Sequence, residues 1–456
     1  MSGISYSTKK YAVLLLATIC IVSFSFSLYY RIRPTVDAKA YDFIAWNLAR
    51  GYGYVEDARN SAMPAADDAI VRVGPGYEFF LAGIYSVFGH HIWMVWFLQA
   101  LLRVGGAYVL FRVVLLILRD HKGREPIALL ATALFGFIPD LIILNGMLLA
   151  ETLFITSFLC ALYASLRALE AKKISFAASA WWGIASLVRP TALVFTFCYA
   201  GYVYITKKSV REVMVILLFP AVFLGAWSLR NSLLYKTPLF TTTAGAYALW
   251  VGNNPDAMGG FDKTPEIQEI RDRHHSVELS KIAMKKYVAF LREEPVRFAA
   301  LQIKKTMMYF SALRPSGFWF YLANKPVERL LTLISSSLAA AFLFVIGGAG
   351  MYWYVVQRGR YRWFLVSAAL LQPLTVIPLY VETRYRAPFF PFLAFFAAYA
   401  LYAFWLSYKE KKPDSLLIRA FFFSGILISI FTLGDGLYSY AIITERIHLL
   451  FSELLL

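Results

Sequence analysis

Residues 35–54 read T-V-D-A-K-A-Y-D-F-I-A-W-N-L-A-R-G-Y-G-Y and come shortly after the first long apolar run, Tyr11 to Tyr30. This stretch carries two carboxylates, Asp37 and Asp42, and Asp37 is close to the point where the chain leaves the lipid. Largely apolar side chains at helical spacing predict an amphipathic helix over Ala38 to Arg50, ended by two glycines. A loop with ordinary solvated acids is the alternative interpretation, and the positions of the other polar residues decide between the two.

The composition indicates a helical membrane protein. Of the 456 residues, 59% are hydrophobic and 17% are aromatic, and the mean hydropathy is +0.58. Several apolar runs reach the ~20 residues that a helix needs to cross a bilayer, which excludes an ordinary soluble domain. We therefore expect an all-α polytopic membrane protein with about eleven transmembrane helices, folded as one domain over residues 1–456.

The formal charge of +17 does not indicate a nucleic-acid partner. Lysine and arginine gather at one set of span ends, as they do where positive charge holds span ends on the cytoplasmic side of a membrane. The three cysteines, Cys20, Cys160 and Cys198, lie within apolar runs and lack the spacing of metal ligands. No acidic cluster suggests a divalent ion either, so we expect neither a metal nor another cofactor.

The charge pattern also orients the chain. Lys9 and Lys10 precede the first apolar run, so the N-terminus is expected inside and Asp37 outside. Two large outer loops follow: residues 31–91, with an interfacial helix over residues 77–88, and residues 232–325, with helical stretches over residues 265–297 and 299–310. The expected spans are roughly 11–30, 92–118, 126–143, 149–166, 176–188, 191–205, 213–229, 327–356, 363–380, 389–406 and 416–437.

This orientation brings a set of charged side chains to the outer face, several of them where a span meets the interface. A charged group there is costly unless it is paired or functional. One arginine at such a place is ordinarily an interfacial anchor, but several that converge with carboxylates indicate a phosphate pocket. A carboxylate beside such a pocket can take a proton from a hydroxyl. The residues of this set are Asp37, Arg72, Glu151, Arg189, Arg230, Glu382, Arg384 and Arg386.

The ordered motifs of the chain resemble a known family. They are D-x-x-x-Y and A-x-N-L-A-x-G-x-G-Y in the first outer loop, then R-V-G-P-G-Y, N-G-M-L-L-A-E-T-L-F, S-L-V-R-P-T-A-L, W-S-L-R-N, G-N-N-P and E-T-R-Y-R-A-P-F-F-P. In this order they resemble the GT-C glycosyltransferases, in the bacterial branch related to dolichyl-phosphate-mannose protein mannosyltransferases and the lipid A aminoarabinose transferase. The resemblance spans nearly the whole chain.

The resemblance implies roles for individual residues. Asp37 matches the catalytic aspartate of the family, the general base, although Ala38 stands where many relatives have a second acid. Arg72 matches a basic residue that holds the donor phosphate, and the same role is implied for Arg384 and Arg386. Glu151 matches an acidic residue that binds sugar or acceptor, with a helix N-cap as the alternative.

Three further residues complete the expected site. Arg189 and Arg230, each at the end of an outward span, would add to the phosphate pocket. Asn253 has side-chain groups that could bind sugar hydroxyls, but N-N-P is equally good turn chemistry.

The resemblance implies an inverting glycosyltransferase that uses a polyprenyl-phosphate sugar at the outer, periplasmic face of a bacterial inner membrane. The acceptor would be a hydroxyl of a lipid, a glycan or a protein, and the sequence does not choose among them. A polymerase or ligase that uses polyprenyl pyrophosphate is one alternative. A transporter of lipid-linked sugars is the other, although it would place its ionisable residues near the middle of the membrane.

Overall fold

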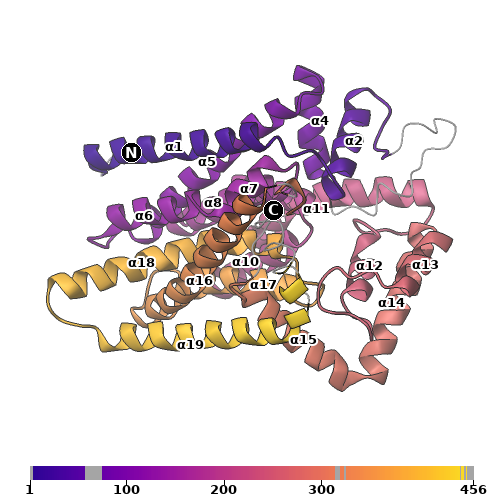
Figure 1. The fold of residues 1–456 in the computed structure, drawn as a ribbon. Coiled ribbons are helices and arrows are strands. Elements are labelled where there is room, and N and C mark those ends of the chain that lie inside the picture. Colours follow the sequence, from indigo (N-terminus) through magenta and orange to yellow (C-terminus); the bar gives the residue numbers. More distant parts are fainter. Residues whose placement is uncertain are drawn as a thin grey trace.

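The computed structural model describes residues 4–56, 74–313, 319–322, 325–441, 443–445 and 448. This part of the chain is helical and contains no strand, which confirms the all-α expectation (Figure 1). The helices are α1 (Tyr6–Tyr30), α2 (Asp37–Ala49), α4 (Gly76–Phe88), α5 (Ile92–Ile117), α6 (Arg124–Gly136), α7 (Pro139–Gly146), α8 (Glu151–Ala171), α9 (Phe176–Val188), α10 (Ala192–Lys207), α11 (Val210–Tyr235), α12 (Ala244–Val251), α13 (Pro265–Arg273), α14 (Ser276–Glu293), α15 (Pro295–Phe310), α16 (Pro326–Val356), α17 (Arg362–Val376), α18 (Phe390–Lys409) and α19 (Ser415–Tyr438), with the 3₁₀ helices η1 (Trp319–Leu322) and η2 (Thr383–Phe389).

The long apolar helices run side by side as a bundle (Figure 1). In the described part of the chain, seven of them are long and apolar enough to cross a membrane, or eight if a bent pair is counted as one span. The expected count of eleven is not confirmed. The other three expected spans correspond to α9, α10 and α17, which have 13, 16 and 15 residues. At 1.5 Å per residue these helices are roughly 20 to 24 Å long, which is short of the ~30 Å hydrocarbon layer.

The bent pair is α6 and α7, which meet at an angle of 53°. The sequence pattern predicted one straight span here, but Pro139 stands at the first position of α7. Proline disfavours the helical conformation in the residue before it, and Ile138 is accordingly extended, with φ −63° and ψ 120°. The chain therefore breaks inside the apolar run, and α7 forms a separate eight-residue helix that leads to α8.

The two outer loops form a helical cap at one end of the bundle, on the right in Figure 1. α2 and α4 correspond to the two helices predicted in the first loop, and α12 to α15 build the second. The predicted helical stretch over residues 265–297 is broken where His274 is extended, so that α13 and α14 are separate. Tyr247, Trp250 and Ile267 belong to a small hydrophobic core of this part of the cap.

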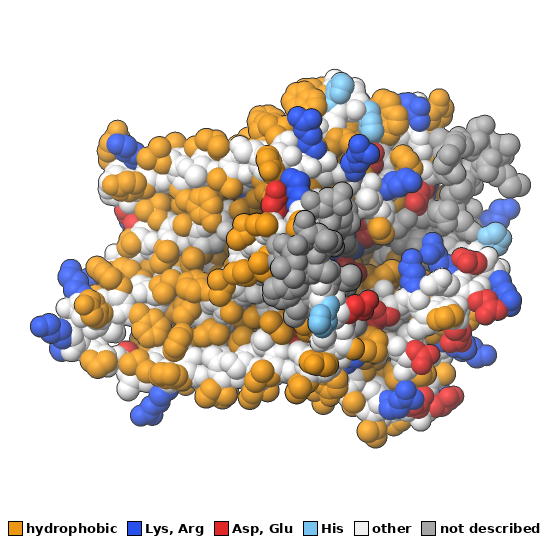
Figure 2. All heavy atoms as spheres, viewed as in Figure 1, with side chains coloured by type: hydrophobic (Ala, Val, Ile, Leu, Met, Phe, Trp, Pro, Cys, Tyr) orange, Lys and Arg blue, Asp and Glu red, His pale blue; other side chains and the backbone are white. Residues whose placement is uncertain are grey.

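The surface agrees with a membrane protein. In Figure 2 hydrophobic side chains cover the long helices, while charged side chains gather at the ends of the bundle and over the cap. α11 exposes Met214, Leu218, Val222 and Leu229 along one length of the bundle. Side chains of this kind suit contact with lipid tails.

Candidate active site

Asp37 begins α2, directly after the loop that leaves α1. The preceding residue, Val36, has φ 50° and ψ −116°, a conformation that a β-branched residue rarely adopts. Backbone strain of this kind gathers at functional sites, where the surrounding structure holds it in place. Because the backbone N–H groups of a first helical turn favour negative charge, the Asp37 carboxylate is well placed at this helix end.

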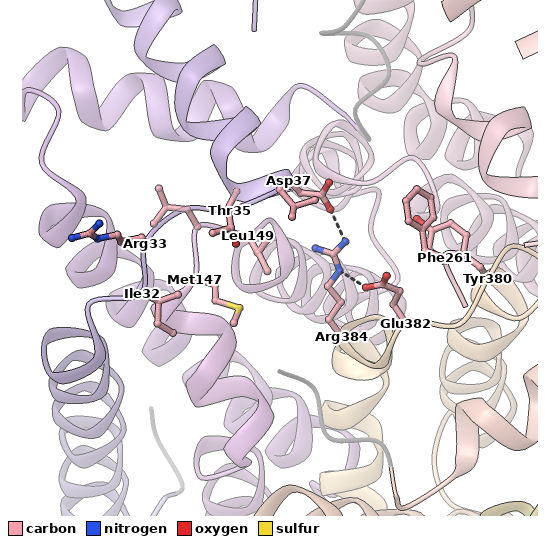
Figure 3. Close-up of a pocket in the computed structure, with 13 residues that line it drawn as sticks. Ile32, Arg33, Thr35, Asp37, Met147, Leu149, Phe261, Tyr380, Glu382 and Arg384 are labelled. Atoms are coloured by element: carbon pink, nitrogen blue, oxygen red, sulfur yellow. Dashed lines mark hydrogen bonds and ion pairs between the residues drawn. The ribbon is translucent and has the colours of Figure 1, made fainter. Parts of the chain in front are cut away.

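Arg384 reaches Asp37 from the far end of the chain. Its Nη2 lies 2.6 Å from Asp37 Oδ2, and its Nε lies 3.4 Å from Glu382 Oε2 (Figure 3). The Arg384 side chain is only 10% exposed, whereas that of Asp37 is 27% exposed. The Arg384 guanidinium is thus held by its neighbours, while the Asp37 carboxylate remains partly exposed and lines a pocket.

Two further charges lie behind this pair. Glu151 is the first residue of α8, and Arg189 ends α9 just before Pro190. Arg189 Nη2 lies 2.6 Å from Glu151 Oε1, which in turn lies 3.8 Å from Arg384 Nε. With Glu382, three carboxylates therefore share two guanidiniums, and they form one continuous cluster.

Tyr385 lies between the two arginines. The guanidinium carbons of Arg189 and Arg384 are 5.0 and 5.1 Å from its ring centroid, within the range of cation–π contacts. Its hydroxyl lies 3.0 Å from that of Tyr380. Tyr385 was not predicted as a site residue. Its place between Arg384 and Arg386 in the sequence E-T-R-Y-R could have indicated it.

A pocket of about 100 Å³ opens beside Asp37 and Arg384. In Figure 3, Arg33 lies at one end of it and the rings of Phe261 and Tyr380 at the other, with Asp37 and Arg384 between them. Its lining consists of Ile32, Arg33, Thr35, Val36, Asp37, Ala38, Met147, Leu148, Leu149, Phe261, Tyr380, Glu382 and Arg384.

Arg33 differs from the other charged groups of the pocket. Within the described part of the chain its guanidinium makes no ion pair or hydrogen bond, and the side chain is exposed. A basic residue at the end of a span is ordinarily an interfacial anchor, so the sequence pattern does not single out Arg33. Its position leaves a cation available to an anionic ligand.

The cap holds the aromatic end of the pocket in place. Gly252 lies so close to the backbone of Leu379 that a Cβ atom would collide with the carbonyl. The N–H of Val381 donates to the Gly259 carbonyl at 2.9 Å, which places Phe261 against Tyr380 with ring centroids 4.9 Å apart. The second outer loop is thus attached to the segment that carries Glu382 and Arg384.

The Glu382 carboxyl group lies in surroundings that change its pKa. Burial raises the pKa of Glu382, and this effect is opposed by the positive charge of Arg384 and reinforced by the negative charges of Asp37 and Glu151. A carboxyl group whose pKa is raised holds a proton more readily near neutral pH. The Glu382 carboxyl therefore holds a proton more readily than that of a solvent-exposed glutamate.

Residues 72–229 match the model of the dolichyl-phosphate-mannose-protein mannosyltransferase family. That family is a member of the GT-C superfamily of membrane glycosyltransferases. No curated protein matches the chain. The matched residues make up about a third of the chain and include Glu151 and Arg189. Asp37, Glu382 and Arg384 lie outside the match, and the fold brings them to the matched pair.

Two arginines predicted for the site, Arg230 and Arg386, are not part of this cluster. Arg72 lies outside the described residues. Arg230 lies on α11 with its guanidinium carbon 5.0 Å from the Trp227 ring and 5.6 Å from the Tyr54 ring. Arg386 is fully buried and donates to the carbonyls of Met308 at 2.6 Å and Ser311 at 2.8 Å.

Asn253 also lies away from the pocket lining. Its side chain is fully buried, and its Nδ2 donates to the carbonyls of Leu249 and Pro378 at 2.7 and 2.9 Å. Its Oδ1 accepts from Lys305 Nζ at 2.6 Å and from Gln302 Nε2 at 2.8 Å. The Asn253 side chain therefore joins the cap to the backbone at Pro378, just before Tyr380.

Proposed function

We propose that the chain is an inverting glycosyltransferase that moves a sugar from a polyprenyl-phosphate donor to an acceptor hydroxyl at the periplasmic face of a bacterial inner membrane. The observation that carries this proposal is the Asp37–Arg384 pair at a pocket beside the first span. It joins a carboxylate that can accept a proton to a guanidinium that can hold phosphate. The family match adds a lipid-linked sugar as the class of donor.

In the proposed reaction the acceptor oxygen attacks the anomeric carbon from the face opposite the phosphate. Asp37 takes the hydroxyl proton as the new C–O bond forms, and the bond between the anomeric carbon and the phosphate oxygen breaks. The electron pair of that bond leaves with the polyprenyl phosphate, whose growing negative charge is stabilised by arginine. The configuration at the anomeric carbon is therefore inverted.

Donor binding would also prepare the base. Without a ligand, Arg384 is paired with Asp37, and a carboxylate held by a guanidinium has a reduced affinity for a proton. A phosphate bound beside Arg384 would share its positive charge, weaken this pair and make Asp37 a better base. The proposal thus links phosphate binding to proton transfer through one arginine.

The test is sugar transfer by the purified protein in lipid vesicles. We expect transfer from a sugar on polyprenyl phosphate and none from the same sugar on a nucleotide, with inverted configuration in the product by NMR. A retained configuration would contradict the direct displacement. Transfer from a polyprenyl-pyrophosphate glycan alone would favour the polymerase or ligase, and movement of intact donor across the vesicle without transfer would favour the transporter.

Arg33 gives a sharper prediction about the donor. If its unpaired guanidinium contacts the phosphate, Arg33→Ala should lower kcat/KM for the donor roughly tenfold to a hundredfold, as expected for a charge-assisted hydrogen bond. Arg31→Ala is the matched control, since Arg31 is also exposed but donates to the Leu28 carbonyl and does not line the pocket. Equal donor kinetics in the two variants would remove Arg33 from the phosphate site.

A further inference from the structure

The break between α6 and the short helix α7 leaves backbone carbonyl groups without partners in their own helices. The last carbonyls of a helix lack partners within that helix, and in a membrane no water is at hand to satisfy them. The break after α6 and the end of α7 both lie within the buried core, where Phe135, Ile143 and Met147 are 2 to 3% exposed. Donors from another element are therefore needed at the end of α6 and at the end of α7.

Gln99 of α5 supplies the donors at the end of α7. Its Nε2 lies 2.8 Å from the carbonyl of Asn145 and 2.9 Å from that of Met147. Its Oε1 accepts from the hydroxyl of Tyr77, on the cap helix α4, at 2.9 Å. Gln99 and Tyr77 are both fully buried. The tyrosine donor fixes which way the amide faces, so both amide hydrogens are directed at the two carbonyls.

Arg103 of α5 supplies the donor at the end of α6. It lies one turn after Gln99 on α5, and its Nη2 donates to the carbonyl of Gly136, the last residue of α6, at 2.6 Å. A buried arginine within a span would otherwise suggest a route for a charged substrate. Here Arg103 instead satisfies the last carbonyl of α6, where the helix breaks. Gln99 and Arg103, one turn apart on α5, thus hold the end of α7 and the end of α6.

The turn held by Gln99 leads directly into the candidate site. Met147, Leu148 and Leu149 line the pocket, and Glu151 starts the next helix. The N–H of Leu149 donates to the same Met147 carbonyl at 3.0 Å. This carbonyl therefore accepts two hydrogen bonds, one from the backbone of the turn and one from the Gln99 amide. A shift of this carbonyl would displace the pocket wall and the glutamate behind Arg384.

We propose that Gln99 is a positioning residue that ties the cap helix α4 to the turn between α7 and α8 and thereby fixes the pocket wall and Glu151. The effect on sugar transfer rests on the proposed function, whereas the effect on the turn does not. Hydrogen exchange reports on the turn, and the rate of sugar transfer reports on the site.

The first variant is Gln99→Met, which keeps the side-chain length and removes every hydrogen bond. We expect faster hydrogen exchange in a peptide covering residues 143–151, because the two carbonyls lose their donor. We also expect kcat to fall about tenfold or more with little change in KM, since a misplaced wall alters the reacting geometry more than binding. The matched control is Gln372→Met in α17, a buried glutamine whose Nε2 has no hydrogen-bond partner among the described residues, and it should change neither quantity.

Gln99→Glu tests the direction of the hydrogen bonds. An ionised glutamate still accepts from Tyr77 but repels the two carbonyls, whereas a protonated one donates to one of them. The rate of this variant, relative to wild type at the same pH, should therefore rise as the pH falls. Rates that stay parallel across the pH range would contradict the proposed donation.

Tyr77→Phe covers the case in which Gln99→Met does not fold. It keeps the ring in its buried place and removes only the donor that orients the amide, so exchange in residues 143–151 should increase by a smaller factor. Unchanged exchange in this variant and in any folded Gln99 variant would overturn the proposal. If the exchange rises but no protein, wild type included, transfers sugar, then the proposed function fails while the positioning role of Gln99 stands.

Discussion

Asp37→Asn is expected to abolish sugar transfer while leaving folding and donor binding largely intact. Asparagine keeps the size of the side chain and can still accept a hydrogen bond from Arg384, but it cannot take the acceptor proton. Loss of a general base ordinarily costs about 10²- to 10⁴-fold in rate. Single-turnover transfer from a polyprenyl-phosphate sugar by the purified variant measures the effect without interference from product release.

The control for this variant is Asp42→Asn on the same helix. Asp42 is 6% exposed and accepts from the Tyr85 hydroxyl at 2.5 Å and from His90 Nε2 at 2.9 Å. It therefore holds α2 against α4 rather than facing the pocket. The substitution should lower thermal stability and leave the rate per folded molecule close to that of wild type.

Transfer at the wild-type rate by the Asp37 variant would show that another group is the base. Sequence reasoning makes Glu151 the next candidate, but the structure favours Glu382. Glu382 lines the pocket with its side chain 25% exposed, whereas Glu151 is 1% exposed and paired with Arg189. Glu382→Gln would then be the variant to test.

The sequence allowed the helices, and the meeting of several charged residues, to be predicted for a physical reason. Apolar length identifies spans, and positive charge at their cytoplasmic ends fixes which polar residues share a face. Asp37 and Arg384 are 347 residues apart, yet the charge pattern predicted that both share one side of the membrane, and the fold brings them to 2.6 Å from each other. Glu151 and Arg189 were placed with them by the same argument.

The details that the sequence did not supply depend on local geometry. Arg384 and Arg386 alternate as they would on one face of a strand, but they lie in the 3₁₀ helix η2, where residues two apart point roughly 120° away from each other. One arginine consequently enters the cluster and the other turns into the protein. Asn253 was open to two interpretations, a sugar ligand or a turn residue, and its contacts are all with the protein. Sequence spacing cannot distinguish an amide that faces a pocket from one that faces a buried backbone.

The pair of arginines in η2 gives the second large effect. Arg384→Ala should lower kcat/KM by about 10²-fold or more, because its charge stabilises the phosphate that leaves in the transition state. Lysine should restore only part of the rate, since an ammonium group cannot reproduce the planar fork that reaches Asp37, Glu382 and phosphate together. Rates are compared per folded molecule, because removing this cation leaves three carboxylates with one guanidinium.

Chemical rescue separates a catalytic from a structural role for these arginines. Arg384 faces a pocket, so added guanidinium ion should restore part of the activity of Arg384→Ala. Arg386 is fully buried against the carbonyls of Met308 and Ser311, so Arg386→Ala should chiefly lower thermal stability, by about 1 to 3 kcal/mol for buried acceptors left without a donor, and guanidinium should not rescue it. Near-normal turnover by Arg384→Ala would mean that Arg384 only anchors the segment, and Arg33, the other arginine that lines the pocket, would then be the candidate to hold the phosphate.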